Sequence, residues 1–218
     1  MESSHEPVRL EAMRWAAEAA ADPRTVYLDT ETTGLGRRAE IVDIGIVDSQ
    51  GRVLMDRLVR PEDPIPAEAS AIHGLYGHHV SHAPRWPDIA DEVASILSGR
   101  RVIVYNARYD RGIVEGCCER HSLAVVGGDA DWQCAMLEYA KYRGEPNTRG
   151  RSFRWHKLDV AVQEFGAPAG GHRALTDALA CRVVVVGMAN GQIGSVEPAL
   201  NAVSDLRETS WLRRLLGR

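Results

Sequence analysis

Two carboxylates, Asp29 and Glu31, follow an apolar run near the start of the chain. The run Val26-Tyr27-Leu28 is typical of a buried strand, and Thr32-Thr33-Gly34 of a turn out of it. Strand side chains alternate between faces, so Asp29 and Glu31 project to the same side. Like charges held that close need compensating positive charge, and hard oxygen ligands suit Mg²⁺ or Mn²⁺. The pair alone is more typical of an exposed strand end, so a metal site requires further acids at the same point.

Two later segments supply further acids and a histidine. The apolar run Val102-Ile103-Val104-Tyr105 precedes Asn106-Ala107-Arg108-Tyr109-Asp110, which predicts a helix that carries an acid in its first turn. His172 and Asp177 then lie five residues apart in His172-Arg173-Ala174-Leu175-Thr176-Asp177-Ala178. A lone histidine there would be a surface residue at a helix start. A histidine five residues before a fourth acid favours chemistry instead.

Together the three segments resemble the motifs of the DEDD superfamily of 3′→5′ exonucleases, in the variant with histidine in its third motif. The proofreading subunit of the replicative DNA polymerase belongs to that group. The resemblance runs from about Val26 to about Gly187. It implies an α/β, ribonuclease-H-like exonuclease fold with a mixed central sheet, an antiparallel hairpin plus parallel strands, flanked by helices.

The resemblance also implies the role of each catalytic residue and two divalent ions, Mg²⁺ or Mn²⁺. Asp29 would bridge both ions, Glu31 and Asp177 would help to hold the first, and Asp110 would act mainly through the water shell of the second. His172 would take the proton from the attacking water. Histidine's ordinary pKa near 6.5 suits a base at neutral pH.

Contacts to the terminal nucleotide are expected from the same motifs. The turn after Glu31 can present backbone N–H groups, and Ile72-His73-Gly74 matches a family turn that lies beside that nucleotide. Gly170-Gly171, just before His172, would let the histidine swing over bound substrate. Tyrosine replaces the more frequent phenylalanine at Tyr109, and its hydroxyl could bond the substrate or a neighbour. The predicted substrate-binding residues are Thr32, Thr33, Gly34, Leu35, His73, Asn106 and Tyr109.

Length and composition are typical of one α/β domain with a sizeable core. The 218 residues are 44% hydrophobic and 26% charged, which is ordinary globular usage. Without a run of about eighteen apolar residues or a charged-then-apolar leader, we expect no membrane span, no secretory signal and a cytoplasmic protein. The four cysteines show no zinc spacing, which predicts free thiols. A net charge of −4 does not suit a protein that coats duplex DNA, although a nuclease needs only a local cationic path.

Three parts are predicted along the chain. Residues 1–24 form an amphipathic helix packed on the domain, with an apolar stripe at Leu10, Met13, Ala17 and Ala20. Residues 25–190 form the exonuclease domain. Residues 191–218 form a C-terminal helical tail, which either covers its own domain, the favoured interpretation, or docks on a partner such as a polymerase or a second copy.

Within the domain, apolar patterns predict the elements that position the motifs. Glu40–Val47 and Arg52–Val59 predict an antiparallel hairpin. Trp86–Leu97 predicts a helix, after which strands and helices alternate, as in parallel crossovers. Leu158–Phe165 is helical in pattern. Val183–Val186 is strand-like by propensity, but the resemblance implies a helix there.

Lys141–Lys157 is the clearly basic stretch, with six cations against the single acid Glu145 and three aromatic residues among them. Cations can follow a phosphate backbone, and aromatic faces can stack on bases. A solvated loop whose aromatics anchor it to the core is an equal alternative. The cations are Lys141, Arg143, Arg149, Arg151, Arg154 and Lys157, and the aromatics Tyr142, Phe153 and Trp155.

His78, His79 and His82 are close in sequence, and positions i and i+4 share a helix face. A transition-metal cluster is one interpretation. Solvated loop histidines are the favoured one, because the segment is short and lacks a further obvious ligand.

The sequence thus predicts a metal-dependent 3′→5′ exonuclease that acts on single-stranded nucleic acid 3′ ends, DNA rather than RNA, and releases nucleoside 5′-monophosphates in proofreading or repair. One alternative is an exoribonuclease that trims RNA ends, since no residue identifies a contact to a 2′-hydroxyl. Another is a retired exonuclease fold that serves as a binding module. The presence of all five catalytic residues argues against retirement.

Overall fold

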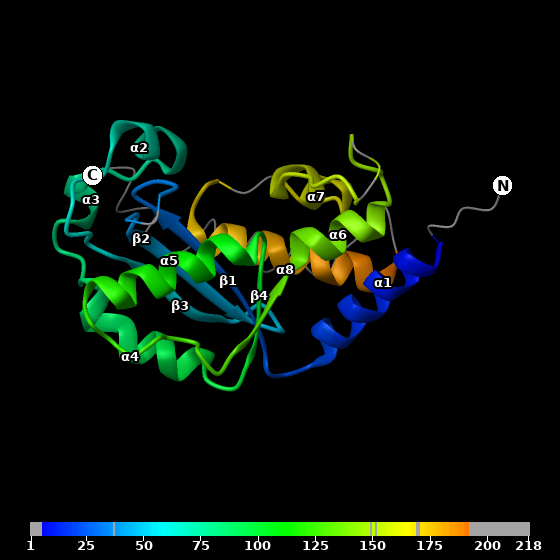
Figure 1. Cartoon of the computed structure of the whole chain (residues 1–218), viewed down its shortest axis with the longest axis horizontal. Helices are drawn as coiled ribbons and strands as arrows, with labels where there is room; N and C mark the ends of the chain where they lie inside the picture. The colour runs from blue at the N-terminus through cyan, green and yellow to red at the C-terminus, as the bar shows by residue number, and fades with distance from the viewer. Residues whose placement is uncertain (1–5, 37, 149, 151, 169–170, 192–218) are drawn as a thin grey trace.

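A five-stranded sheet with helices on both faces forms the protein (Figure 1). The computed structural model describes residues 6–36, 38–148, 150, 152–168 and 171–191. The strand order is β3-β2-β1-β4-β5. The strands are β1 (Thr25–Thr32), β2 (Ile41–Asp48), β3 (Val53–Leu58), β4 (Arg101–Val104) and β5 (Asp131–Cys134).

The sheet is mixed, as predicted. β1 pairs antiparallel with β2, and β2 antiparallel with β3, which confirms the hairpin. On its other side β1 pairs parallel with β4, and β4 parallel with β5. The carboxyl ends of β1 and β4 therefore lie at one edge of the sheet, where the sequence places its acids.

The two faces of the sheet have separate apolar cores, because β1 side chains alternate between them. Tyr27 packs under one layer of helices, and Val26 and Leu28 pack against the other. The first layer contains α1 (Glu6–Ala21), α6 (Ala135–Arg143), α7 (Leu158–Glu164) and α8 (Ala174–Asn190), and the second α4 (Trp86–Leu97) and α5 (Ala107–Arg120). The short α2 (Ala67–His73) and α3 (Gly77–Val80) connect β3 to α4.

Several predicted helices are present. α4 has the predicted bounds, and α7 ends one residue earlier than expected. Val183–Val186 lies within α8, so the helix that the resemblance implied is confirmed against strand propensity. None of the helices among the described residues has the length and apolar character needed to cross a membrane.

The predicted packing stripe of α1 is right for Met13, which packs against the core, and wrong for Leu10 and Ala17. α1 packs on α8 and α6 through Ala12, Ala16 and Ala19, all fully buried. Leu10 and Ala17 are exposed. The alanines pack best because their small side chains let the helix lie close to its neighbours. Of the predicted tail at 191–218, all but Gly191 lies outside the described residues.

α8 lies directly on β2 at Gly45. A Cβ at Gly45 would be 2.3 Å from the backbone nitrogen of Leu175, so no larger residue fits without moving the helix. Gly45 is the register partner of Asp29. The first turn of α8 therefore lies against the sheet beside Asp29.

Candidate active site

The acidic side chains of β1 face α8. Register pairs Tyr27 with Val47, Asp29 with Gly45 and Glu31 with Asp43. Since Tyr27 and Val47 both pack under α8, the two-residue period puts Asp29 and Glu31 on the same face. The sequence suggested that both acids follow the end of the strand. In the structure β1 continues to Thr32, so Asp29 and Glu31 lie within it.

Glu31, His172 and Asp177 converge between β1 and the start of α8. Each offers a ligand atom, and these three atoms all lie within 4.8 Å of one another. In the part of the chain that the structure describes, no other group of three histidine, cysteine or acidic residues has this geometry. His172 is exposed and has a positive φ of 49°, a left-handed conformation that few non-glycine residues adopt.

Asp110 reaches the same place from the opposite face of the sheet. It lies in the first turn of α5, is buried, and accepts hydrogen bonds from Thr30 N at 3.1 Å and Thr30 Oγ1 at 2.7 Å. Asp29, next to Thr30, interacts electrostatically with Asp110, Asp177 and Glu31. The structure thus brings together all five residues that the sequence predicted to be catalytic.

Burial raises the pKa of all four acids, and repulsion from neighbouring acids raises the pKa of Asp29 and Glu31 further. Desolvation is the main cause and raises the pKa of Glu31 to about 8, with Asp177 the next contributor. Burial and then Asp110 raise the pKa of Asp29 far above its ordinary range. Burial likewise raises the pKa of Asp110 and Asp177. Four carboxylates so placed cannot all be ionised at neutral pH without added positive charge.

This donor set fits divalent metal ions. The four acids offer hard carboxylate oxygens, which Mg²⁺ and Mn²⁺ prefer. Bound ions would contribute the positive charge that lets these carboxylates ionise together.

The turn after β1 is held by Tyr109. Its hydroxyl oxygen lies 2.6 Å from Thr32 Oγ1 and donates to the Gly34 carbonyl at 2.8 Å. Thr33 Oγ1 accepts the Glu40 N–H at 2.9 Å and fixes the other side of the turn. The sequence left open whether the Tyr109 hydroxyl bonds the substrate or a neighbouring residue. In the structure it bonds Thr32 and Gly34 and supports the turn.

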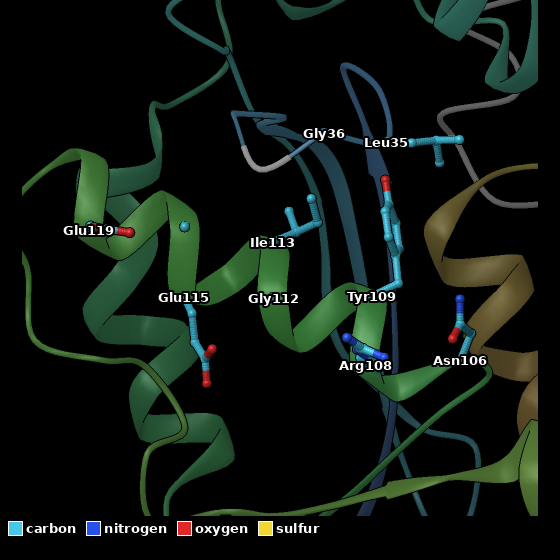
Figure 2. A pocket seen from close by; sticks show the side chains of 10 residues that line it. Leu35, Gly36, Asn106, Arg108, Tyr109, Gly112, Ile113, Glu115 and Glu119 are labelled. Atoms are coloured by element: carbon cyan, nitrogen blue, oxygen red, sulfur yellow. The ribbon is translucent and has the colours of Figure 1, made fainter.

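Next to this turn lies a cavity of about 560 Å³ along α5 (Figure 2). Leu35, Asn106 and Tyr109 line it, and Figure 2 shows them at one end of the cavity with Ile113 and Glu115 further along α5. Leu35 is 90% exposed, so its side chain is available to a ligand. The structure thus places three of the predicted substrate-binding residues around one cavity.

His73 is the last residue of α2 and precedes a turn at Gly74. Its side chain is buried, and Nδ1 accepts the Leu75 N–H at 3.0 Å. Burial lowers the pKa of His73, and Arg173 and His172 lower it further, which places the turn near the catalytic histidine. Nδ1 therefore holds the turn.

Asp43 and Arg173 are site residues that the sequence reasoning missed. Asp43 Oδ2 accepts hydrogen bonds from Arg173 Nε at 2.7 Å and from Ala174 N at 3.2 Å. Asp43 is fully buried opposite Glu31. The available signal was an acid inside the apolar run Ile41-Val42-Asp43-Ile44, which a buried strand does not tolerate without a partner.

Glutamates neutralise part of the basic stretch Lys141–Lys157. Arg143 is ion-paired with Glu145 and Glu164, and Lys141 bonds Glu138 at 2.8 Å. Arg154 has a longer contact of 3.7 Å with Glu145. Arg149 and Arg151 lie outside the described residues.

The three aromatic residues of this stretch differ in how deeply they are buried. Tyr142 is in the core, Phe153 is half-buried, and Trp155 is 63% exposed. The interpretation as a core-anchored loop therefore applies to Tyr142. Trp155 remains a candidate for stacking on a nucleic-acid base, because its side chain is exposed.

His78 and His79 interact with each other and with Tyr76. Their ring centroids are 3.9 Å apart, and His79 Nδ1 accepts the Tyr76 N–H at 3.0 Å. His82 is exposed. These contacts give His79 a role in holding its own short helix.

The chain belongs to the RNase_T family of exonucleases, whose family model matches residues 26–184. With the DEDD motifs and the mixed sheet, this makes it a 3′→5′ exonuclease of the superfamily that the sequence suggested. It is 42% identical over 166 residues to an uncharacterized exonuclease, CP81, of Escherichia phage 186, covering 73% of this chain and 84% of that protein.

Two further comparisons concern more distant proteins. The chain is 38% identical over 93 residues to subunit epsilon of DNA polymerase III from Rickettsia conorii, but this match covers only 40% of each chain. Among solved structures, exonuclease X in complex with 5′ overhanging duplex DNA has a TM-score of 0.54 at 24% identity, covering 82% of this chain and 98% of that one. The predicted ribonuclease-H-like exonuclease fold is confirmed.

Proposed function

We propose that the protein removes nucleotides from the 3′ end of single-stranded DNA in a metal-dependent reaction. The observation that carries this proposal is the convergence of Asp29, Glu31, Asp110 and Asp177 beside His172. A retired fold used only for binding would have no need of four acids held so close that they repel one another.

Asp29, Glu31, Asp110 and Asp177 would hold two divalent ions, Mg²⁺ or Mn²⁺. Bound ions supply the Lewis acidity that makes water a nucleophile near neutral pH and stabilises negative charge on the leaving 3′-oxygen. The hydrogen bonds from Thr30 fix the orientation of the Asp110 carboxylate. The first turn of α8, held against β2 at Gly45, fixes the position of Asp177.

His172 would accept the proton of the attacking water. It is exposed, so substrate and solvent can reach its ring. One of its ring nitrogens lies within 4.8 Å of a carboxylate oxygen of Glu31 and of Asp177. The Asp177 carboxylate beside it would stabilise the imidazolium that forms.

The terminal nucleotide would occupy the cavity lined by Leu35, Asn106 and Tyr109. Leu35 and the His73 turn would close over the terminal sugar beside Glu31, leaving space for a 3′-hydroxyl that bonds the carboxylate. A 3′-phosphate would meet Glu31 at contact distance, where burial makes like charge costly. Duplex ends would be poor substrates, because terminal bases must first unpair.

Similarity to a polymerase III epsilon subunit and to a DNA-bound exonuclease supports DNA as the substrate and a role in proofreading or repair. The same similarity supports a polymerase partner, and the C-terminal segment 191–218 is one candidate for docking. A homodimer is the alternative.

The test is a time course of degradation of matched 5′-labelled DNA and RNA strands, each with a 3′-hydroxyl or a 3′-phosphate, with Mg²⁺, Mn²⁺ or a chelator. We expect a ladder that shrinks from the 3′ side on hydroxyl-ended DNA, release of nucleoside 5′-monophosphates, and no cleavage with chelator. Faster digestion of RNA would favour the exoribonuclease alternative. Internal cuts, or equal digestion of the 3′-phosphorylated strand, would contradict the proposal.

A further inference from the structure

Asp43 is a fifth acid at the active site. It is fully buried and is not one of the four proposed metal ligands. It lies in β2 opposite Glu31, on the face that α8 covers. Its side chain reaches across to the start of α8, where Oδ2 accepts Arg173 Nε at 2.7 Å and Ala174 N at 3.2 Å.

These two bonds hold the backbone and side chain at Arg173, the N-cap of α8, whose carbonyl takes part in the first turn of the helix. The Arg173 carbonyl accepts the Asp177 N–H at 3.0 Å and the Thr176 hydroxyl at 2.8 Å. His172 directly precedes Arg173 in the chain. Any shift of Arg173 therefore moves His172 and Asp177 together.

Asp43 also replaces the usual cap of the helix. The N-cap position is Arg173, whose side chain makes no cap hydrogen bond. Asp43 instead accepts the Ala174 N–H from the neighbouring strand and puts a negative charge at the helix N-terminus, where the helix dipole favours it.

This cap is electrostatically costly. Burial raises the pKa of Asp43, and Asp43 in turn contributes to the raised pKa of Glu31. A serine or asparagine cap would avoid that repulsion. Unlike a serine or asparagine, a charged carboxylate at this position forms a directional, charge-assisted hydrogen bond with Arg173. A buried pair of this kind can fix a single geometry, which an apolar contact would not do.

We propose that Asp43 and Arg173 are positioning residues that set the geometry of His172 and Asp177 at the metal-binding site. The proposal rests on the proposed function, and metal affinity provides a readout that does not require cleavage. Loss of a partner that orients ligands commonly weakens metal binding or activity by roughly 10- to 100-fold.

The test compares Asp43→Asn and Arg173→Met with a matched control, Asp48→Asn. Asp48 is a buried acid of the same strand, paired with Arg52 at 2.6 Å, but it lies at the β2–β3 turn. Mn²⁺ affinity is measured by calorimetry, turnover per folded molecule by cleavage, and stability by thermal unfolding. If the wild-type protein binds Mn²⁺ but cleaves nothing, the proposed function fails while the affinity comparison stands.

We expect Asp43→Asn and Arg173→Met to weaken Mn²⁺ binding and lower kcat by roughly 10- to 100-fold with little change in KM. Arg173→Lys should recover part of both, because it keeps the charge. Asp48→Asn should lower thermal stability alone. If Asp43→Asn does not fold, Arg173→Met gives the result. Unchanged Mn²⁺ affinity and kcat in the folded variants would overturn the proposal and leave the pair a purely structural role.

Discussion

Folding affects the charges of two regions of the molecule in opposite ways: it brings the acids of the site together, and it pairs cations of the basic stretch with glutamates. The acids of β1, α5 and α8 are separated by up to 148 positions in the chain, yet the fold brings them together. The Arg173 guanidinium beside Glu31 is itself bound by Asp43. The cations of Lys141–Lys157 are neighbours in sequence, yet glutamates neutralise Lys141 and Arg143.

The difference shows which charges are available to a ligand. Repelling acids at a sheet edge remain a binding site for cations, because folding leaves their charge uncompensated. A run of cations is a binding site for phosphates only where folding has not paired them. Arg154 and Lys157 meet that condition better than Arg143, since both are exposed.

The largest expected effect tests the acidic side of this comparison. Asp29→Asn should lower the cleavage rate by roughly 10³-fold or more, because an ion ligand worth several kcal/mol in the transition state is lost. In the presence of a chelator the variant should be more stable than wild type, since one of the repelling charges is gone. Cleavage assays and thermal unfolding measure the two effects.

The control is Asp91→Asn, at an exposed acid of α4, which should change neither property. Near wild-type turnover of Asp29→Asn would show that the metal assignment is wrong.

His172→Ala should lower the rate by roughly 10²-fold, as for loss of a general base, while Mn²⁺ binding largely survives on the four acids. The acidic limb of the pH–rate profile should disappear, because the group that must be deprotonated is absent. His121→Ala, at the C-cap of α5, is the control. Persistence of the limb in His172→Ala would place the base elsewhere.

The sequence predicted the acidic site better than the basic one, for a physical reason. Asp29, Glu31 and Asp110 follow or lie within apolar strands whose order and direction bring their ends together, so local pattern and topology suffice. The Glu164 partner of Arg143 is set by how α6 packs against α7, and no local pattern contains that information. Asp43 was missed because its partner, Arg173, is 130 residues away in the chain.

The exposed aromatic of the basic stretch should contribute to binding more than its cations. Trp155 makes no ring contact or hydrogen bond with the residues that the structure describes. The next residue is anchored, because the Tyr105 hydroxyl donates to the His156 carbonyl at 3.0 Å beside Asn106. Trp155→Ala should raise KM for an oligonucleotide by roughly 5- to 150-fold, the range of one stacked base, and leave dinucleotide cleavage unchanged.

An abasic scan sharpens this test. If Trp155 stacks on one base, removing that base should abolish the effect of Trp155→Ala, whereas abasic positions elsewhere should preserve it. Val125→Ala, at an exposed residue before β5 and so at the opposite edge of the sheet, is the control. Equal KM values for Trp155→Ala and wild type would return the whole stretch to the solvated-loop interpretation.

The pH dependence of stability is a smaller effect. Glu31 has a pKa of about 8 in the folded protein, against 4.5 ordinarily, so between these values the folded state binds more protons than the unfolded state. Stability of the metal-free protein should therefore fall as pH rises from about 5 to about 8, and each kcal/mol lost lowers Tm by roughly 2–4 °C. Mg²⁺ should reduce this fall.

Thermal unfolding of the wild type and Glu31→Gln in chelator measures it. The variant should lose part of the pH dependence, since its side chain does not titrate. An identical pH dependence in both proteins would mean that Glu31 is ionised throughout, contrary to the repulsion inferred at the site.

The smallest expected effect distinguishes paired from unpaired cations directly. Each phosphate that a cation neutralises on a single strand adds about 0.7 to the slope of log affinity against log salt. Arg154→Ala or Lys157→Ala should each reduce that slope by up to about 0.7, with kcat at saturating substrate little changed. Arg143→Ala should leave the slope unchanged and lower thermal stability instead, because it leaves Glu164 without its ion pair. Oligonucleotide binding at several salt concentrations measures the slopes. Equal slopes for all variants would show that DNA does not contact this stretch, and a lower slope for Arg143→Ala would show that its glutamate partners release it when DNA binds.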